Sequence, residues 1–367
     1  MAKLTREAVL AALSTVQDPD LHKDLVALGM IQDLEVGDDG AVTGRIVLTT
    51  PACPMKERIQ REATEAVAAV DGVSQINFTM DAVVAKPTTP QGDRLPGVKN
   101  IIGVGAGKGG VGKSTVSVNL AVALARTGAA VGLLDADIYG PSVPMMLGVA
   151  SARPAVDEDR KLIPIEAHGI RFMSMGLLVP ADEAVVWRGP MIGRAVQQFV
   201  EDVAWGDLDY LIVDLPPGTG DVVLSLSQAI PMSGAVVVAT PQDVAFADVT
   251  RAVRMFGMLK IDILGLVENM AWFHCPDNGK DYPIFGQSRA PDHCAAMGVE
   301  LLCRLPIDLA VSPAADSGRP IAVDAPDSEQ TKLYADLAGA VASRQEILNH
   351  KRAKRSELKD FFRVVPS

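Results

Sequence analysis

The stretch that decides the fold is GAGKGGVGKST, residues 105–115. From Gly107 to Ser114 it matches the phosphate-loop pattern G-x-x-x-x-G-K-[ST]. Glycines in such a loop let backbone N–H groups turn inward and form an anion nest at a helix N-terminus. We expect Lys113 to reach the β- and γ-phosphates of ATP, Ser114 to bind Mg²⁺ and Thr115 to lie beside the α-phosphate. The predicted nucleotide-binding residues of the loop are Gly107, Lys108, Gly109, Gly110, Val111, Gly112, Lys113, Ser114 and Thr115.

Apolar runs alternate with helical stretches on both sides of this loop. The loop itself follows one such run and opens a helix that ends near Gly128. Runs that are apolar on both faces are typical of parallel strands covered by helices on each side. We therefore expect an α/β fold, a P-loop NTPase with a mainly parallel β-sheet flanked by helices. Its strands are predicted at Ile101–Val104, Val131–Leu134, Leu211–Val213, Ala235–Ala239, Leu264–Val267 and Leu301–Leu305.

Acidic loops follow two of these strands. They are LDADIYGPS at residues 134–142 and DLPPGTGD at residues 214–221. Because the carboxyl ends of parallel strands share one edge of a sheet, both loops should face the phosphates. Asp214 fits the role of holding Mg²⁺ through water, Asp135 is a second candidate for the Mg²⁺ shell, and Asp137 is the candidate for positioning the attacking water. The predicted catalytic residues of the loop and these two strings are Lys113, Asp137 and Asp214, and the resemblance described below adds Lys108.

The first 85 residues read as a separate, small α+β unit. Thr5 can cap a helix through about Val16, and a second helix is predicted from Pro54 to Val70. Short β-type runs at 31–36, 45–49 and 73–80 complete the unit. KPTTPQGDRLPG then has three prolines and two glycines, which is typical of a linker. The predicted organisation is a small domain at 1–85, a linker at 86–98, an ATPase domain at 99–340 and a basic tail at 341–367.

The overall charge argues against two classes of partner. With 34 basic and 45 acidic residues the net charge is −11, so neither nucleic acid nor an anionic membrane is expected as the main partner. The N-terminal MAKLTREAVL does not resemble a secretory signal, and no window approaches eighteen apolar residues. We expect a cytoplasmic protein whose four cysteines, where they matter, act as thiolates rather than in disulfides.

Lys108 is a second lysine inside the phosphate loop. In this respect the loop resembles the deviant Walker A class of MinD, ParA and the nitrogenase iron protein. The resemblance implies a homodimer in which the extra lysine reaches across to the partner's phosphates, as an arginine finger does.

Several longer strings resemble one family within that class. They are WRGPM at 187–191, TPQDVA at 240–245 and VENM at 267–270, with DPDLHKDLVALGMI at 18–31 and TTPACPM at 49–55 in the small domain. With the loop and the two acidic strings, they resemble the Mrp/ApbC iron–sulfur cluster carrier ATPases over nearly the whole chain. The resemblance implies a homodimer that receives a [4Fe–4S] cluster from cluster donors and passes it to apo iron–sulfur proteins under the control of ATP. It also implies that Asn269 and the Pro306 region recognise adenine.

One position departs from the family pattern. The family usually has a C-x-x-C pair just after the VENM-like string, whereas FHCPDNG, residues 273–279, keeps Cys275 and has Asn278 at the second place. A dimer then presents two Cys275 thiolates, and an iron–sulfur cluster normally takes four ligands. Three accounts stay open: His274 or Asp277 completes the shell, a labile cluster uses exogenous thiols, or cluster binding has been lost.

The other cysteines divide into two groups. Cys53 is a possible cluster ligand, because it lies in a proline-flanked loop and the resembling domain has a cysteine at this place that is associated with clusters. Cys294 and Cys303 are expected to be apolar filler in a helix and a strand.

Two other functions fit the same loop. A MinD/ParA-type regulatory ATPase would switch partner binding by nucleotide-driven dimerisation, without a cluster. A metabolic kinase or synthetase would need an acceptor pocket, which the sequence does not identify.

Overall fold

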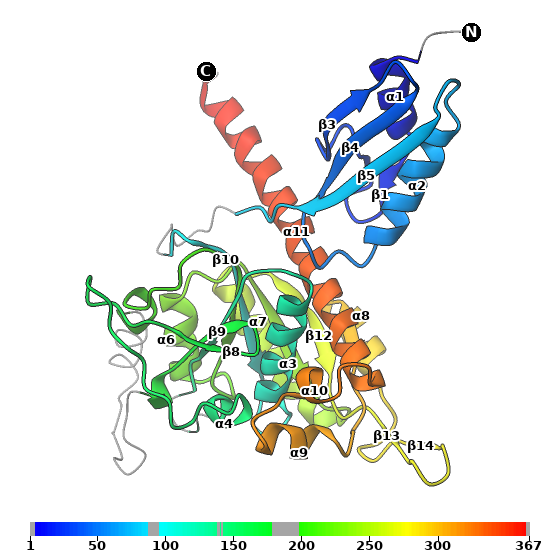
Figure 1. Cartoon of the computed structure of the whole chain (residues 1–367). Helices are drawn as coiled ribbons and strands as arrows, with labels where there is room; N and C mark the ends of the chain where they lie inside the picture. The colour runs from blue at the N-terminus through cyan, green and yellow to red at the C-terminus, as the bar shows by residue number, and fades with distance from the viewer. Residues whose placement is uncertain (1–3, 87–94, 138–139, 141, 178–197, 365–367) are drawn as a thin grey trace. The chain divides into compact units, whose positions relative to one another are not determined.

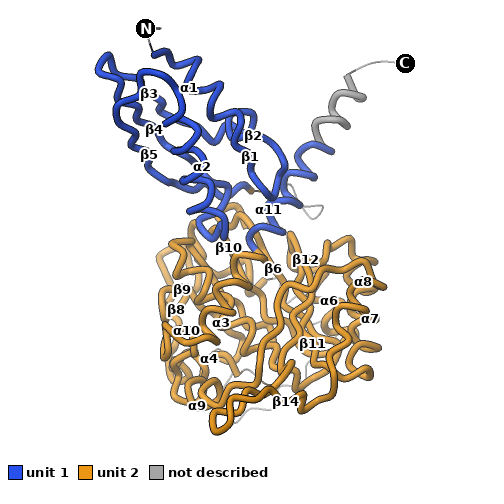
Figure 2. Tube along the Cα trace, turned by 90° about the vertical axis from the view of Figure 1, so that its right-hand side faces the viewer, with its two compact units in different colours: residues 1–85, 342–367 blue, residues 86–341 orange. Residues whose placement is uncertain are grey.

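The computed structural model describes residues 4–86, 95–137, 140, 142–177 and 198–364, with side chains up to residue 355. The WRGPM string at 187–191 lies outside the described residues, as do residues 138, 139 and 141 of the first acidic loop. The chain forms two compact units, one of residues 1–85 and 342–367 and the other of residues 86–341 (Figure 2).

The first unit is built on the three-stranded sheet β3-β4-β5. Helix α2 connects β4 to the parallel β5, and its buried residues Ile59, Ala63 and Val67 recur at helical spacing toward the sheet. The elements of this unit are α1 (Arg6–Leu13), β1 (Gln17–Asp18), β2 (Lys23–Asp24), β3 (Ile31–Val36), β4 (Ala41–Leu48), α2 (Lys56–Ala68) and β5 (Gln75–Ala82).

The predicted start of α1 is confirmed, but its predicted end is wrong. The Thr5 hydroxyl accepts a hydrogen bond from the Ala8 N–H at 3.2 Å, as an N-cap does. The helix ends at Leu13 rather than Val16, because the hydroxyls of Ser14 and Thr15 bond to carbonyl groups of the last turn.

Part of the long helix α11 (Glu329–Val364) belongs to this first unit. The helix passes residue 341, the start of the predicted tail, without a break. Gln345 and Asn349 are buried, and the Asn349 amide bonds to the Ala85 carbonyl at 3.4 Å. Lys23 Nζ lies 3.2 Å from His350 Nε2. These contacts make residues 345–350 a structural part of the small domain.

Glu346 gives this domain a pH-dependent stability. Burial, with the Asp18 carboxylate as a second cause, raises the pKa of Glu346 to about 7. The folding stability that depends on the protonated carboxyl of Glu346 is therefore fully present below the unfolded pKa, and it is lost as pH rises through 7. We expect Glu346→Gln to raise the free energy of unfolding at pH 8 by about 1–2 kcal/mol, after allowance for partial exposure. Urea unfolding between pH 4.5 and pH 8 checks this, and the gain should vanish at the acid end.

Glu65→Gln, on an exposed position of α2, is the matched control and should change stability equally at all pH values. A gain from Glu346→Gln that is independent of pH would contradict the assignment.

The second unit contains an eight-stranded sheet with the order β15-β12-β11-β6-β10-β7-β9-β8. Every adjacent pair is parallel except β8 with β9. This confirms the predicted fold class. The strands are β6 (Val98–Ala106), β7 (Val131–Asp135), β8 (Ile165–Ala167), β9 (Ile170–Ser174), β10 (Leu208–Asp214), β11 (Gly234–Ala239), β12 (Ile263–Glu268) and β15 (Leu301–Arg304), with the small hairpin β13 (Phe273–His274) and β14 (Asp281–Tyr282).

Helices cover both faces of this sheet (Figure 1). Side chains of α6, α7 and α8 form one core with Leu211, Val213 and Val237, while α3 packs against β7 and β10. The helices are α3 (Lys113–Arg126), α4 (Val143–Met146), α6 (Asp221–Ala229), α7 (Asp243–Met258), α8 (Ala290–Met297), α9 (Val311–Asp316) and α10 (Ile321–Asp324). Within the described residues, no helix has the length and apolar content needed to cross a membrane.

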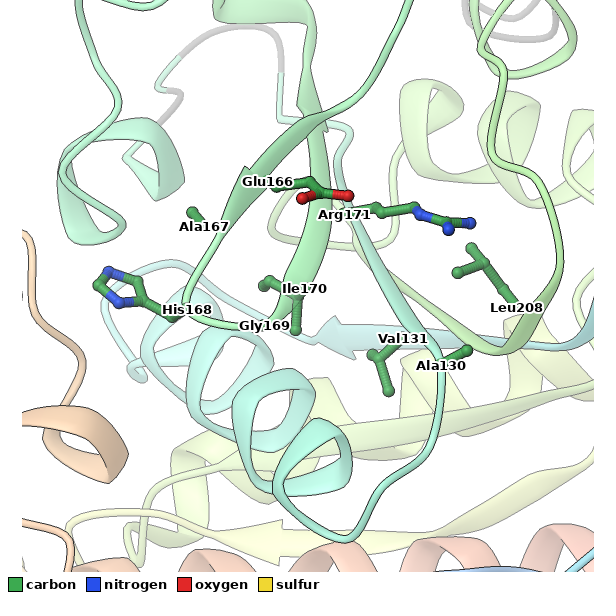
Figure 3. Close-up of a pocket in the computed structure, with 9 residues that line it drawn as sticks. All are labelled: Ala130, Val131, Glu166, Ala167, His168, Gly169, Ile170, Arg171 and Leu208. Atoms are coloured by element: carbon green, nitrogen blue, oxygen red, sulfur yellow. The ribbon is translucent and has the colours of Figure 1, made fainter.

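All six predicted strands are present, and the hairpin β8–β9 is an addition to them. It turns at His168 and Gly169, whose φ angles are 50° and 81°. Figure 3 shows this turn beside a cavity of about 330 Å³ lined by Ala130, Glu166 and Arg171, among others. The cavity lies where β7 and β9 begin, so it is at the opposite edge of the sheet from the phosphate loop.

Candidate functional site

The phosphate loop joins β6 to α3 and has the backbone geometry of an anion nest. Gly110 and Gly112 both have φ 78°, a left-handed conformation that favours glycine. A Cβ at Gly107 would collide with the backbone of Asp248 in α7, so close packing also requires glycine there. Helix α3 begins at Lys113 without a side-chain cap, which leaves its first N–H groups for a ligand.

Asp214 is the centre of the site. Its carboxylate is fully buried at the end of β10, and Lys113 Nζ lies 2.8 Å from its Oδ2. The Ser114 hydroxyl donates to the same oxygen at 2.7 Å. Ser117 Oγ lies 2.6 Å from Oδ1, one turn further along α3. The predicted residues Lys113, Ser114 and Asp214 therefore meet in one cluster, and Ser117 is a member that the sequence analysis missed.

Asp135, at the end of β7, is a second buried carboxyl next to this cluster. Burial and the Asp214 carboxylate raise the pKa of Asp135 to about 8, against hydrogen bonds from the Asp137 N–H and the Ser174 hydroxyl. These bonds measure 3.1 Å and 3.0 Å. Ser174 ends β9 and was missed because that strand was not predicted.

Two of the predicted loop residues lie at the margin of the cluster. Thr115 is in the first turn of α3. Lys108 is partly exposed and makes no hydrogen bond or ion pair within the described part of the chain.

Asn269 follows β12 and contacts the phosphate loop. Its amide donates to the Val111 carbonyl at 2.8 Å. The preceding Glu268 is fully buried and accepts hydrogen bonds from Ser288 Oγ at 2.7 Å and from Arg304 Nε at 2.7 Å. The Arg304 guanidinium lies 5.4 Å from the centre of the Trp272 ring. This network fixes the segment that leaves β12.

A cavity of about 320 Å³ lies between that segment and the start of α11. Pro306, Asp308 and Gln330 contribute to its lining, together with His274 and Pro276. Gln330 is only 3% exposed, and its Oε1 has no hydrogen-bond partner among the described residues. A buried acceptor without a donor is costly, and the side-chain amide of Gln330 is also hydrogen-bonded with Tyr334.

Cys275 lies in the turn of the β13–β14 hairpin. The turn closes through bonds from the Cys275 N–H to the Lys280 carbonyl and from the Gly279 N–H to the Cys275 carbonyl, both at 2.9 Å. Asn278 donates to the Tyr282 hydroxyl at 2.9 Å and accepts from the Lys280 N–H at 3.0 Å. Asn278 therefore stabilises the turn.

His274 has a side-chain partner within the hairpin. His274 Nδ1 lies 2.7 Å from Asp281 Oδ1 on the neighbouring strand. His274 and Pro276 line the cavity, whereas Cys275 between them does not. This arrangement weighs against His274 and Cys275 of one chain binding the same iron.

Of the other cysteines, Cys53 and Cys303 are partly buried, as Cys275 is, and Cys294 is buried. Cys294 lies in the core of the second unit, as expected for filler. Burial raises the pKa values of Cys53, Cys294 and Cys303 to about 11 each. Near Cys53, the carboxylates of Asp18 and Asp20 add to the increase, so its neutral form is favoured without a cation. The described residues hold no group of three or more potential metal ligands.

Comparisons with known proteins agree with this geometry. The family model described as NUBPL iron-transfer P-loop NTPase matches residues 97–342, and the model described as iron–sulfur cluster assembly protein matches residues 6–78. An iron–sulfur cluster carrier protein of Deinococcus radiodurans is 52% identical over 336 residues, which is 92% of this chain and 94% of the relative. The carrier protein of Helicobacter pylori is 38% identical, over 99% and 98% of the two chains.

Solved structures support the fold of the second unit. A nucleotide-binding protein of Archaeoglobus fulgidus in complex with ADP is similar with a TM-score of 0.58 and 38% identity, over 66% of this chain and 94% of that one. The cell-division ATPase MinD of Pyrococcus furiosus is similar in fold, with a TM-score of 0.50 and 23% identity over 66% and 98% of the two chains. The resemblance to carrier ATPases is confirmed, and the chain belongs to the NUBPL iron-transfer P-loop NTPase family, with an N-terminal domain of the iron–sulfur cluster assembly type.

Proposed function

We propose that the protein is an ATP-dependent iron–sulfur cluster carrier that works as a homodimer. The observation that carries the ATP part is the contact of Lys113 and Ser114 with the buried Asp214, directly below a glycine loop in anion-nest geometry. The cargo part rests on the family and on the carrier relatives. Each part is argued separately below.

The donor set fits Mg²⁺. The ion prefers oxygen ligands and keeps several of its waters, and Ser114, Asp214 and Asp135 supply a hydroxyl and two carboxylates at one end of the sheet. Two buried carboxyl groups beside one lysine also favour a cation electrostatically, and a cation there would favour the ionised form of Asp135. Bound Mg²⁺ would neutralise charge on the β- and γ-phosphates. Asp137, next to this cluster, is proposed to orient the attacking water.

The cavity at Pro306 fits the base of the nucleotide. Asn269, on the segment that leads from β12 to His274, bonds to the phosphate loop. Prolines and aliphatic side chains supply apolar lining to the cavity. The unpartnered Gln330 Oε1 and the Asp308 carboxylate are acceptors. Acceptors match the exocyclic amino group of adenine, and the similar nucleotide-binding protein of Archaeoglobus fulgidus is in complex with ADP. ATP is therefore the proposed nucleotide.

In the proposed homodimer, Lys108 of each chain contacts the phosphates bound by its partner. Within its own chain, Lys113 already occupies the place beside Asp214, and Lys108 is partly exposed on the same edge. A second copy facing this edge would receive the Lys108 ammonium at its phosphates. Such a cation from a partner stabilises the charge that develops during phosphoryl transfer.

The proposed cargo is a [4Fe–4S] cluster shared between two copies of Cys275. Cys53, in the first unit, is proposed as a separate cluster-related thiol of its own domain. The ligand set of one chain does not fit a cluster by itself, since Asn278 supports the turn and His274 faces the cavity. Two thiolates from two chains leave two positions for exogenous thiols or for thiolates of the receiving protein. Such a cluster would be labile, which suits transfer more than storage.

Metal content tests this proposal. After anaerobic reconstitution with iron and sulfide, the parent dimer should hold about four irons and four sulfides, the stoichiometry of one cluster, and Cys275→Ala should hold less than about a tenth of that. Inductively coupled plasma analysis and visible absorbance measure both variants.

Cys303→Ala is the matched control, because Cys303 is a partly buried thiol that contacts the Leu333 carbonyl. It should retain parent-like iron. Equal iron content in the parent and in Cys275→Ala would refute the cargo site and leave a nucleotide-driven dimer switch of the MinD/ParA type.

A further inference from the structure

We infer that the hairpin carrying Cys275 forms one wall of the base cavity, so that a bound base controls the reactivity of the Cys275 thiol. The inference rests on the proposed nucleotide function and names the residues that connect base and thiol. His274 and Pro276 are the connecting residues.

The cavity lining places these two residues on either side of the cysteine. His274 and Pro276 face the same space as Pro306 and Gln330, while Cys275 between them is not part of the lining. The backbone of Cys275 is therefore part of the wall whose His274 and Pro276 side chains would touch the base. A ligand that displaces or immobilises His274 and Pro276 therefore also displaces or immobilises Cys275.

The wall is joined to the opposite side of the cavity by backbone pairing. The Ile307 N–H donates to the Trp272 carbonyl at 2.6 Å, and the Ala271 N–H donates to the Leu305 carbonyl at 2.9 Å. Phe273 and Ile307 also form a parallel β-bridge. The stem of the hairpin and the segment that carries Pro306 thus form one paired strip, which is attached to β12 and β15.

The hairpin is stiff enough to transmit a displacement. Three contacts cross it: His274 with Asp281, Asn278 with Tyr282, and the backbone bond from Cys275 to Lys280. The tip therefore moves with its stem rather than bending locally. In this chain Asn278 strengthens the turn at the place where the resembling family has a second thiol.

The consequence is a link between base occupancy and the thiol. With the cavity filled, His274 and Pro276 are held and the hairpin has one orientation. With the cavity empty, the exposed hairpin samples more orientations, and the thiol meets an attacking reagent more often. Phosphates alone touch neither His274 nor Pro276, so they should restrain the hairpin less than a bound base does.

Alkylation of Cys275 in the full-length protein tests this link. Iodoacetamide labelling is followed by mass spectrometry of the Cys275 peptide with Mg·ADP, with Mg·pyrophosphate and without ligand. Mg·ADP should slow labelling at least about fivefold, the lower end of ordinary coupling between two sites. Mg·pyrophosphate, which has no base, should change the rate by less than about twofold. Labelling of Cys53, in the other unit, is the internal control and should not respond.

A double variant, His274→Ala with Pro276→Gly, removes the side chains of the wall. Because the wall contacts the base, ADP should bind more weakly, and labelling is compared at ADP concentrations that calorimetry shows to be saturating. At saturation the variant should lose the difference between ADP and pyrophosphate. The inference would be wrong if ADP and pyrophosphate gave equal labelling rates in the parent, or if the double variant kept its response to ADP. Either result would leave the proposed nucleotide function standing. Absence of ADP binding in the parent would overturn the proposed function and the base cavity with it.

Discussion

Replacing Lys113 with alanine is expected to abolish ATP binding. The ammonium is the one positive charge of the chain that the structure places against Asp214 below the loop, among the described residues, and it is 7% exposed. Its charge-assisted bonds to the β- and γ-phosphates would be lost. We expect the Kd for Mg·ATP to rise at least about a hundredfold, which corresponds to roughly 3 kcal/mol. Isothermal calorimetry measures this directly.

The same substitution leaves the carboxylate of Asp214 buried without its partner, beside Asp135. Some loss of stability is therefore expected too, and the melting temperature should be measured alongside binding. Lys99→Ala is the matched control. Lys99 is ion-paired with Asp209 at 2.8 Å, at the start of β6 and away from the loop. A folded Lys113→Ala variant that binds ATP as the parent does would disprove the phosphate role of Lys113.

The nucleotide loop was predictable because its chemistry is local. A glycine loop between a strand and a helix needs only adjacent residues. Asp214 ends β10, and its partner Lys113 begins the helix that follows the neighbouring parallel strand β6. Ser117 could have been found as well, since it lies four residues after Lys113 on the same face of α3.

Other parts of the site had no local pattern to reveal them. Strand β8 has three residues, and β9 contains Arg171, so neither forms a long apolar run. Ser174, which bonds to Asp135, was therefore missed with its strand. The base cavity combines three segments that are remote in sequence. Gln330 became a candidate ligand-binding residue only because the structure buries it with its Oε1 unpartnered among the described residues. Tertiary packing creates both features.

Replacing Lys108 with alanine is expected to separate binding from hydrolysis. Lys108 makes no described contact with its own Asp214 cluster, so the Kd for Mg·ATP should change by less than about threefold, within the range of an exposed charge. If the lysine acts from the partner, kcat should fall at least about a hundredfold, by analogy with loss of an arginine finger. Nucleotide-dependent dimerisation should also weaken, which sedimentation with a non-hydrolysable ATP analogue measures.

Mixing two inactive variants distinguishes action on the partner from action within one chain. In a mixed dimer of Lys108→Ala with Lys113→Ala, the first chain keeps Lys113 in its loop and receives Lys108 from the second chain. That one site is complete if Lys108 reaches across, so a substantial part of the ATPase activity should return on mixing. If Lys108 serves its own loop, both sites of the mixed dimer stay defective and activity does not return. Lys108→Arg, which keeps the charge, should retain more activity than Lys108→Ala in either case. Complementation by mixing therefore decides whether the second lysine makes the loop a dimer-dependent switch.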